Sequence, residues 1–292
     1  MKGLSYNRQK IFIATAFLIV PVILLIVFSF YPAVKLFEFS FSDWDGVRPY
    51  YNYVGFSNYV DLFKDMNTWR TLSNNFAYIV IMLVQIVMAL YFAIILDTNI
   101  RGRNFFRSMI FVPYILNGVA VAFMFNYMYD FNSGPINMIL KNIGLGQYAI
   151  RWLGDGYYIN FSLALIALWK YMGFNMVIFI GALQSLPQEL YEASRIDGAN
   201  FYHNIRYIII PNIKSVIEMS IFLGLNGALQ AFSEAWIITK GGPAGRSATF
   251  ITSTLDIAFK YQNFGKASAM GVMLLLIILA VVLVQKKYLR ER

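Results

Sequence analysis

The sequence has no cysteine, a single histidine and few charged residues. Asp, Glu, Lys and Arg together make up only 13% of the 292 residues. Without cysteine, this chain cannot form disulfides or use thiol chemistry, although that absence identifies no cellular compartment. One histidine also leaves little material for a metal site or for acid–base catalysis. We therefore predict that the chain holds no metal and no catalytic residue.

Apolar residues take the place of the missing charge. They make up 59% of the chain, and the mean hydropathy of +0.57 is too high for a water-soluble domain with a polar surface. Six apolar runs are long enough to cross a hydrocarbon core of about 30 Å at about 1.5 Å per residue. They cover residues 11–33, 76–96, 109–129, 159–183, 216–236 and 266–285. The sequence thus predicts an all-α integral membrane protein, with residues 11–285 forming a six-span domain.

Lysine and arginine predict the orientation of the spans. Residues 1–10, 97–108, 184–215 and 286–292 contain 13 of these cations in 61 positions, whereas the alternate connections contain 9 in 100. Because positive residues are retained on the cytoplasmic side, we expect both termini there, with 1–10 and 286–292 as cytoplasmic segments. The first run is too long for the core of a signal peptide, and we expect it to stay as a span kinked at Pro21. The net charge of +9 follows from this topology and gives no reason to expect nucleic-acid binding.

A polar segment, residues 185–211, separates the fourth and fifth runs and carries helix signals. Ser185 and Gln188 have the spacing of a capping box. Gly198 can end the first helix because glycine adopts the left-handed conformation at little cost. Asn200 can cap a second helix, and Pro211 marks the beginning of the next span. The segment is therefore predicted to be a helix, a sharp turn and a second helix.

This segment, SLPQELYEASRIDGANFYHNIRYIIIP, resembles the EAA loop of binding-protein-dependent ATP-binding-cassette (ABC) importers. The family pattern falls on Glu192, Ala193, Ser194, Gly198, Ile208, Ile210 and Pro211. The resemblance implies that this cytoplasmic loop contacts the ATPase, through Glu192, Ala193, Ser194, Asp197, Gly198 and Pro211. We call residues 185–211 the EAA-like loop. An ordinary amphipathic hairpin on the membrane surface is the alternative interpretation.

Further fragments resemble the carbohydrate-type permeases of the maltose and glycerol-phosphate group. They are GFSNYVDLF (55–63), FFRSMIFVP (105–113), GPINMIL (134–140), WLGDG (152–156), WKYMGF (169–174), TKGGP (239–243) and FGKASAMG (264–271). The resemblance implies a prokaryotic cell-membrane protein that forms half of a pathway for a sugar, which we expect to be an oligosaccharide. It implies three kinds of protein partner in addition to membrane lipid: a second homologous permease, an extracellular solute-binding protein and two ATPases that bind ATP and Mg. No cofactor is expected in this chain.

The substrate pathway is predicted from polar and aromatic residues inside spans, where unpaired polar groups are costly. The resemblance places sugar-contact positions on Tyr171, Phe174, Gly224, Ala228 and Ala231. Gln230 and Glu234 are spaced to share one helix face, which adds them to the pathway. Three small residues predict an open surface with few donors, which leaves open whether this subunit or its partner binds the sugar. Close helix packing would explain the same small residues. Glu234 is alternatively an interfacial carboxylate or a partner of Lys240.

Gly241, Gly242 and Pro243 are predicted to form a tight, backbone-exposed turn at the outer gate, where the solute-binding protein would dock. A plain surface turn is the alternative. Two other classes of protein are alternatives. An ion-coupled secondary sugar transporter would show charged groups at mid-membrane and internal repeats, and a membrane enzyme would need clustered histidines or carboxylates. The sequence shows neither pattern.

Overall fold

The computed structural model of the protein describes residues 6–154, 156 and 158–290, and every regular element in these ranges is helical. The chain divides into two compact units, Met1–Asp65 with Thr254–Leu276, and Met66–Ser253 with Ile277–Arg292. Some sequence predictions fall on residues outside the described ranges. These are Asp155 of the WLGDG fragment, residues 1–5 of the N-terminal segment and residues 291–292 of the C-terminal segment.

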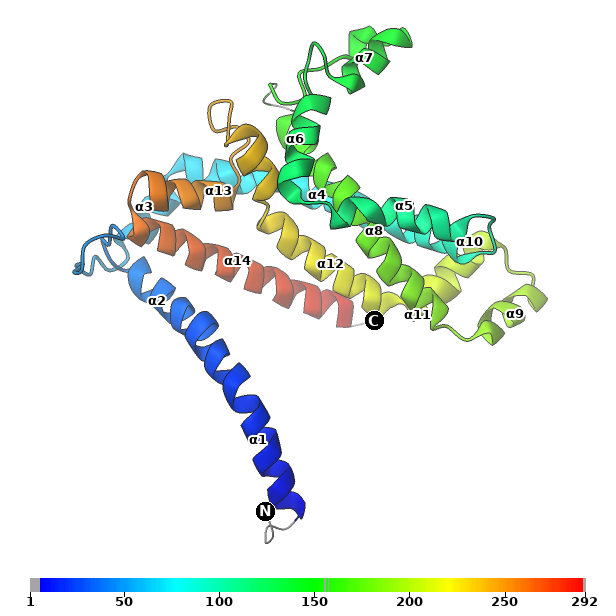
Figure 1. The fold of residues 1–292 in the computed structure, drawn as a ribbon, viewed down its shortest axis with the longest axis horizontal. Coiled ribbons are helices and arrows are strands. Elements are labelled where there is room, and N and C mark those ends of the chain that lie inside the picture. The colour runs from blue at the N-terminus through cyan, green and yellow to red at the C-terminus, as the bar shows by residue number, and fades with distance from the viewer. Residues whose placement is uncertain (1–5, 155, 157, 291–292) are drawn as a thin grey trace. The chain divides into compact units, whose positions relative to one another are not determined.

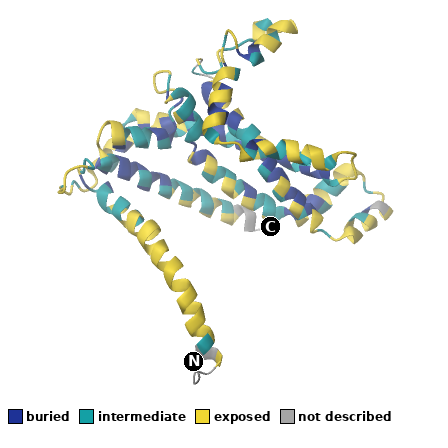
Figure 2. Cartoon of the chain, in the orientation of Figure 1, coloured by how far each residue is buried: buried dark blue, intermediate teal, exposed yellow. Residues whose placement is uncertain are grey.

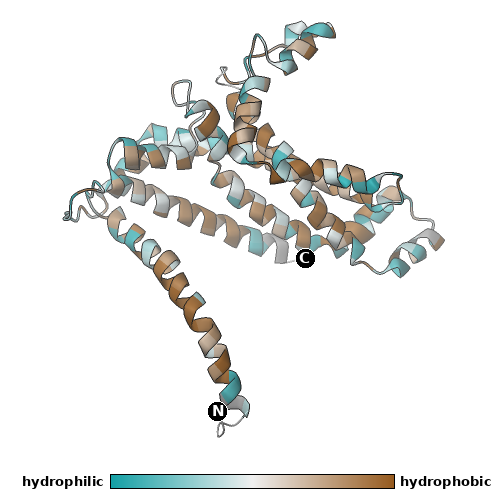
Figure 3. Ribbon diagram, viewed as in Figure 1, coloured by the Kyte–Doolittle hydropathy of each residue, from teal (hydrophilic) through white to brown (hydrophobic). Residues whose placement is uncertain are grey.

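The first unit begins with a long apolar helical run. Its elements are α1 (Tyr6–Leu25), the π-helical turn η1 (Ile26–Phe30), α2 (Tyr31–Ser40), α3 (Ser57–Lys64), η5 (Asp256–Lys260) and the first part of α14 (Phe264–Arg290). The side chains of α1 are apolar and exposed along nearly the whole helix (Figures 2 and 3). The helix continues past Pro21, which has no N–H to donate to the preceding turn, and becomes π-helical at η1. An apolar, uncovered helix of this length suits a lipid environment.

Hydrogen bonds to backbone carbonyls attach the loop after α2 to other parts of the first unit. The Asn58 side-chain amide donates to the carbonyls of Ser40 (2.9 Å) and Ser42 (2.8 Å). The amide of Gly265 donates to the carbonyl of Trp44 at 2.9 Å. A side chain at position 265 would place Cβ 2.0 Å from the Ser42 carbonyl oxygen, so only glycine permits this approach.

The second unit contains the remaining helices. They are α4 (Met66–Asp97), α5 (Arg103–Ile115), α6 (Gly118–Met128), α7 (Pro135–Asn142), η2 (Gly146–Tyr148), α8 (Ile159–Gln184), α9 (Gln188–Ile196), α10 (Phe201–His203), η3 (Asn204–Ile209), α11 (Ile210–Asn212), α12 (Lys214–Leu229) and η4 (Ala235–Thr239), and α13 (Phe250–Leu255) crosses the unit boundary. Helix α8 packs against both α4 and α5, and α12 packs against α4 (Figure 1).

Small residues bring α4 and α8 together. Ala89 and Ala93, one turn apart on α4, are fully buried in a cluster with Met176 and Phe179 of α8. In a membrane the association of helices depends on close van der Waals contact, because lipid removes most of the hydrophobic driving force. The alanines allow this contact, and the larger side chains of α8 fill the space that they leave.

In the described part of the chain, four helical stretches are long and apolar enough to span a membrane: Gln9–Ser40, Met66–Asp97, Ile159–Gln184 and Phe264–Lys287. Two further pairs pass the same test but are bent, Arg103–Ile115 with Gly118–Met128 by 99° and Phe201–Asn212 with Lys214–Leu229 by 73°. The described residues thus contain up to six spans, if each bent pair crosses once. At the first bend Leu116 is extended, and Asn117 caps α6 by accepting a hydrogen bond from the Val119 amide at 2.9 Å.

The apolar run 216–236 also contains a break, since α12 ends at Leu229 and residues 230–232 are not helical. The buried Asn75 side chain of α4 donates to two carbonyls of the last α12 turn, at 2.8 and 3.1 Å. The Thr249 hydroxyl donates to the carbonyl of Ala231 at 2.7 Å. These side chains donate to carbonyls at the break, where the regular helical hydrogen bonding ends in an apolar setting.

Candidate functional site

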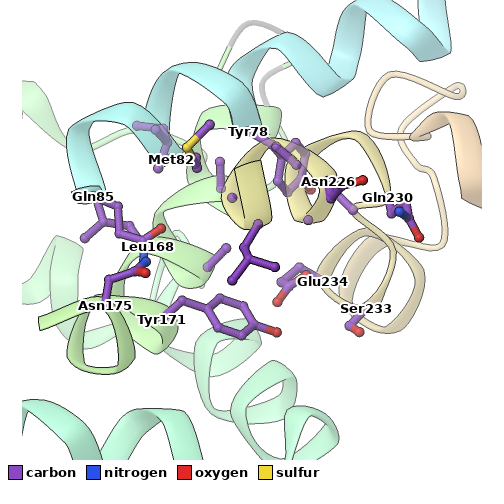
Figure 4. A pocket seen from close by; sticks show the side chains of 18 of the residues that line it. Tyr78, Met82, Gln85, Leu168, Tyr171, Asn175, Asn226, Gln230, Ser233 and Glu234 are labelled. Atoms are coloured by element: carbon purple, nitrogen blue, oxygen red, sulfur yellow. The ribbon is translucent and has the colours of Figure 1, made fainter. Parts of the chain in front are cut away.

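The second unit encloses a cavity of about 560 Å³ between α4, α5, α8 and α12 (Figure 4). All seven residues predicted for the substrate pathway line it: Tyr171, Phe174, Gly224, Ala228, Gln230, Ala231 and Glu234. These residues come from α8, α12 and the segment after the α12 break, so the fold brings together positions that are up to 63 apart in the sequence.

The small residues of α12 differ from one another in what they face. A side chain at Gly224 would place Cβ 2.7 Å from Cγ and 2.8 Å from Sδ of Met82, so the methionine of α4 occupies the space beside the glycine. Ala228 and Ala231 are also largely buried. The prediction of an open surface is therefore wrong at Gly224, where close helix packing is the reason for the small residue.

The aromatic residues form a partly exposed group. Tyr171 is 40% exposed. Phe174 stacks on Tyr114 of α5, with ring centroids 4.7 Å apart and planes 20° apart. Tyr114 also meets the edge of Tyr171 at 6.0 Å, and Lys170 lies over the Tyr171 ring at 5.5 Å. One face of Phe174 is thus covered by protein, and Tyr171 is the ring more available to a ligand.

The prediction that Gln230 and Glu234 share one helix face is wrong. Because the helix ends at Leu229, the two residues do not lie one turn apart on a continuous helix, although both line the cavity. Glu234 forms no ion pair with Lys240 within the described part of the chain. Lys240 instead adopts the left-handed conformation (φ +49°) at the end of η4.

The lining residues that the sequence analysis missed include three with polar groups, Tyr78 and Gln85 of α4 and Tyr114 of α5. Tyr78 and Gln85 are buried, with exposed fractions of 4% and 6%. The Tyr78 hydroxyl and Gln85 Nε2 have no hydrogen-bond partner within the described residues. The same rule that selected polar residues in the fourth and fifth runs would have selected Gln85 in the second run.

The EAA-like loop has the backbone that the sequence predicts after α9. Gly198 takes a φ of +73°, and the Ala199 amide donates back to the Ser194 carbonyl at 2.9 Å, as at a helix end closed by glycine. The Asn200 side chain accepts from the His203 amide at 2.9 Å and caps the next helix. The predicted capping box is wrong: the Ser185 hydroxyl donates backward to the Ala182 carbonyl at 2.7 Å and so belongs to the end of α8.

The side chains of this loop divide into a buried and an exposed group. Ser194 is buried, and its hydroxyl donates to the Tyr191 carbonyl at 2.8 Å. Tyr191 packs against the α4–α8 cluster, and its burial, followed by the charge of Asp97, raises the pKa of the tyrosine. Glu192 is exposed and accepts a hydrogen bond from the Gln188 side chain at 2.8 Å. The remaining predicted positions are exposed: Ala193, Asp197, Gly198 and Pro211, the last within α11.

The turn at 241–243 is less exposed than predicted. Gly241 is buried with a φ of +78°. The Gly242 carbonyl accepts from the Ser247 hydroxyl at 2.6 Å, and the Gly242 amide donates to the Thr239 carbonyl at 2.8 Å. The prediction of a backbone-exposed turn is therefore wrong for the two glycines. The exposed part of this loop begins at Pro243.

Comparison with known proteins identifies the family. Residues 85–290 match the family described as the binding-protein-dependent transport system inner membrane component. The chain belongs to this family. The matched range includes the EAA-like loop and the lining residues of the cavity from Gln85 onward, but not Tyr78, Ile81 or Met82. The protein is thus a multi-pass membrane permease and not an enzyme, and nothing in the comparisons supports an ion-coupled secondary transporter.

Curated relatives and solved structures agree with this assignment. The permease has 32% sequence identity to the probable ABC transporter permease YurN of Bacillus subtilis, and the alignment covers 97% of this chain and 98% of YurN. It also has 32% identity to the diacetylchitobiose uptake system permease NgcF of Streptomyces coelicolor, with 94% of this chain and 80% of NgcF aligned. The permease also superposes on one chain in the crystal structure of a bacterial ABC transporter involved in the import of the acidic polysaccharide alginate. The match covers 98% of the permease and 97% of that chain, with a TM-score of 0.85 and 21% sequence identity. That structural likeness shows the fold.

Proposed function

We propose that this permease forms half of the translocation pathway of a sugar importer and that its substrate is an oligosaccharide. The proposal includes a second homologous permease, an extracellular solute-binding protein and two ATPase subunits that bind ATP and Mg and carry out hydrolysis. Relatives named for diacetylchitobiose uptake and for trehalose and maltose transport support the choice of substrate class.

The observation that carries the proposal is the convergence of the seven pathway residues on one cavity. A volume of about 560 Å³ lies within the usual range of ligand sites, and its surface combines aromatic rings with neutral amides. Aromatic faces suit the C–H surfaces of sugar rings, and amides suit hydroxyl groups. This combination favours an uncharged polyhydroxyl substrate held weakly, as transport requires.

Coupling to the ATPase is proposed to occur through the EAA-like loop. Beyond the predicted polar residues, the loop exposes several large apolar side chains, of which Ile196 at 86% and Tyr202 at 77% are the most exposed. Apolar side chains gathered on a polar loop are typical of protein–protein contact sites. Glu192, one turn before Ile196 on α9, would add a charge-assisted hydrogen bond, which is stronger and more directional than a neutral one. Tyr191 links the loop to the α4–α8 cluster and would transmit its movement.

The proposed cycle is one of alternating access. The solute-binding protein delivers sugar to the outer surface of the permease pair, where the exposed tip after Gly242 is a candidate contact. ATP-driven closure of the ATPases moves the EAA-like loops and turns the cavity outward. Hydrolysis returns it to the inward-open state and releases the sugar. In this cycle the permease itself forms no covalent bond with its substrate.

Replacing Tyr171 by alanine is expected to reduce sugar uptake several-fold without abolishing it. One aromatic contact is worth on the order of 1 kcal/mol, which corresponds to roughly a fivefold change. Phe174→Ala should act less specifically, because this ring also stacks on Tyr114 and its loss removes packing. The measurement is the uptake rate in reconstituted vesicles at a saturating concentration of sugar-loaded solute-binding protein.

The matched control is Phe161→Ala, which removes an exposed ring of α8 that does not line the cavity. Its uptake rate should equal that of the parent. If Tyr171→Ala and Phe174→Ala leave both the rate and the range of transported sugars unchanged, the pathway lies in the partner permease instead.

A further inference from the structure

The cavity has an uneven distribution of charge. Among its lining residues only Glu234 carries a charged group, and the other polar lining residues are neutral amides and hydroxyls. In Figure 4 the Glu234 carboxylate and the Tyr171 ring lie next to each other, and the two groups interact electrostatically. A single carboxylate in such a site sets the sign of the local potential, since low-dielectric surroundings screen it weakly.

No cation neutralises Glu234 by direct contact. Within the described residues, no lysine or arginine lies within 4.0 Å of its carboxylate. Lys170 acts on Glu234 electrostatically but is not one of the lining residues. Its ammonium group lies over the Tyr171 ring and near Gly118 of α6, where an added Cβ would be 3.3 Å from Nζ.

The opposite side of the cavity supplies an independent indication of a ligand. Tyr78 and Gln85 are seven residues apart on α4, which places them two turns apart on one helix face. The Tyr78 hydroxyl and Gln85 Nε2 are buried and lack partners among the described residues. Buried polar groups normally have partners, so a hydroxyl-bearing ligand would complete this side of the site.

We propose that Glu234 selects the substrate by charge, so that the cavity admits uncharged, hydroxyl-bearing sugars and rejects sugars that carry a carboxylate. This inference rests on the proposed function of the cavity as the sugar pathway. Glu234 accepts hydrogen bonds from sugar hydroxyls, while the unpaired groups of Tyr78 and Gln85 bind the sugar from the α4 side. The same fold occurs in an importer of the acidic polysaccharide alginate. The charge of the substrate is thus decided by side chains in the cavity and not by the fold.

The absence of cysteine from the chain permits a direct test. Ser233→Cys places one thiol beside Glu234 in the cavity lining of the assembled transporter. The thiol is treated with two methanethiosulfonates of similar size, one carrying a trimethylammonium group and the other a sulfonate. We expect the ratio of the cationic to the anionic rate constant to fall about tenfold or more when Glu234→Gln is added, as removal of one nearby charge predicts.

Glu218→Gln is the matched control, because Glu218 lies on α12 but does not line the cavity. It should leave the rate ratio of the Ser233→Cys protein unchanged. An equal ratio with and without Glu234→Gln overturns the inference, and so does a thiol that neither reagent reaches.

A protection experiment separates the inference from the proposed function. Neutral di- and trisaccharides and a trigalacturonate are added in turn during labelling. We expect a neutral sugar to slow labelling and the uronate to do so only after Glu234→Gln. If no sugar slows labelling although the charge ratio falls, the sugar pathway is wrong, and only the preference of the cavity for cationic over anionic reagents stands. If neutral sugars protect but Glu234→Gln does not admit the uronate, charge selection is wrong and the sugar pathway stands.

Discussion

Gly198→Val is expected to abolish uptake while leaving the permease folded in the membrane. Gly198 has a φ of +73°, a conformation that costs an L-residue roughly 1–2 kcal/mol and a β-branched residue more. Apart from its chain neighbours, no described residue has an atom within 4 Å of the added Cβ, so the strain acts on the loop backbone and not through a clash. The turn between α9 and α10 should open and present Glu192, Ile196 and Tyr202 in the wrong arrangement. The measurements are uptake and co-purification of the ATPase with the permease.

Gly144→Val is the matched control. Gly144 also has a left-handed φ of +81° and open space around its added Cβ, but it lies in the loop after α7, away from the EAA-like loop. The backbone strain is similar, so uptake should persist if the effect at Gly198 is specific. Gly198→Asn should restore part of the activity, because asparagine tolerates this conformation.

Glu192→Ala tests the same contact without altering the backbone. A hydrogen bond to a charged group contributes about 1.5–3 kcal/mol, so the affinity for the ATPase should fall by roughly tenfold or more. If Gly198→Val and Glu192→Ala permeases, present at normal abundance, bind the ATPase and transport like the parent, the coupling role of the loop is wrong.

Gly173→Ala is expected to prevent the permease from packing correctly. An added Cβ would lie 2.1 Å from the Ile110 carbonyl oxygen and 2.7 Å from the Phe111 Cα. Both atoms belong to the α5 backbone and cannot rotate away, so α5 and α8 must separate. Overpacking of this kind typically costs about 1–3 kcal/mol. The detergent-solubilised permease should lose several degrees of thermal stability, at roughly 2–4 °C per kcal/mol, and Tyr114 and Phe174 should no longer stack.

Gly181→Ala is the matched control in the same helix. Apart from the backbone of α8 itself, no described residue has an atom within 4 Å of the Cβ added at Gly181. Since alanine favours helix by up to about 1 kcal/mol relative to glycine, this variant should melt at the parental temperature or slightly above it. Equal melting temperatures for Gly173→Ala and Gly181→Ala would show that α5 and α8 have room to separate at no cost.

The EAA-like loop shows which local features could be predicted. The turn at Gly198 and the cap at Asn200 depend on a few adjacent residues, and the structure has both. The predicted capping box is wrong because Ser185 lies between two helices. Its hydroxyl could accept from an amide of the following helix or donate to a carbonyl of α8, and it donates to α8. Sequence spacing does not show which of two neighbouring helices a serine caps.

The cavity shows which features could not be predicted from the sequence. The sequence selected seven of its lining residues but not Tyr78 or Tyr114, because a tyrosine within an apolar run gives no sign of the direction in which its ring points. The break after Leu229 was also unpredictable, since the groups that stabilise it, Asn75 and Thr249, come from distant parts of the chain. Without that break, Glu234 would follow Gln230 by one helical turn.

The sequence by itself determined the class of protein, the apolar runs, the EAA-like loop and most candidate pathway residues. These properties follow from composition, helix length and short-range hydrogen bonding, all of which are local in the chain. Only the tertiary structure decided where helices bend, which small residues face Met82 or Ile110, and which polar groups meet in one cavity. Such features depend on contacts between helices far apart in sequence, and a single sequence does not specify which side chains will occupy a shared space.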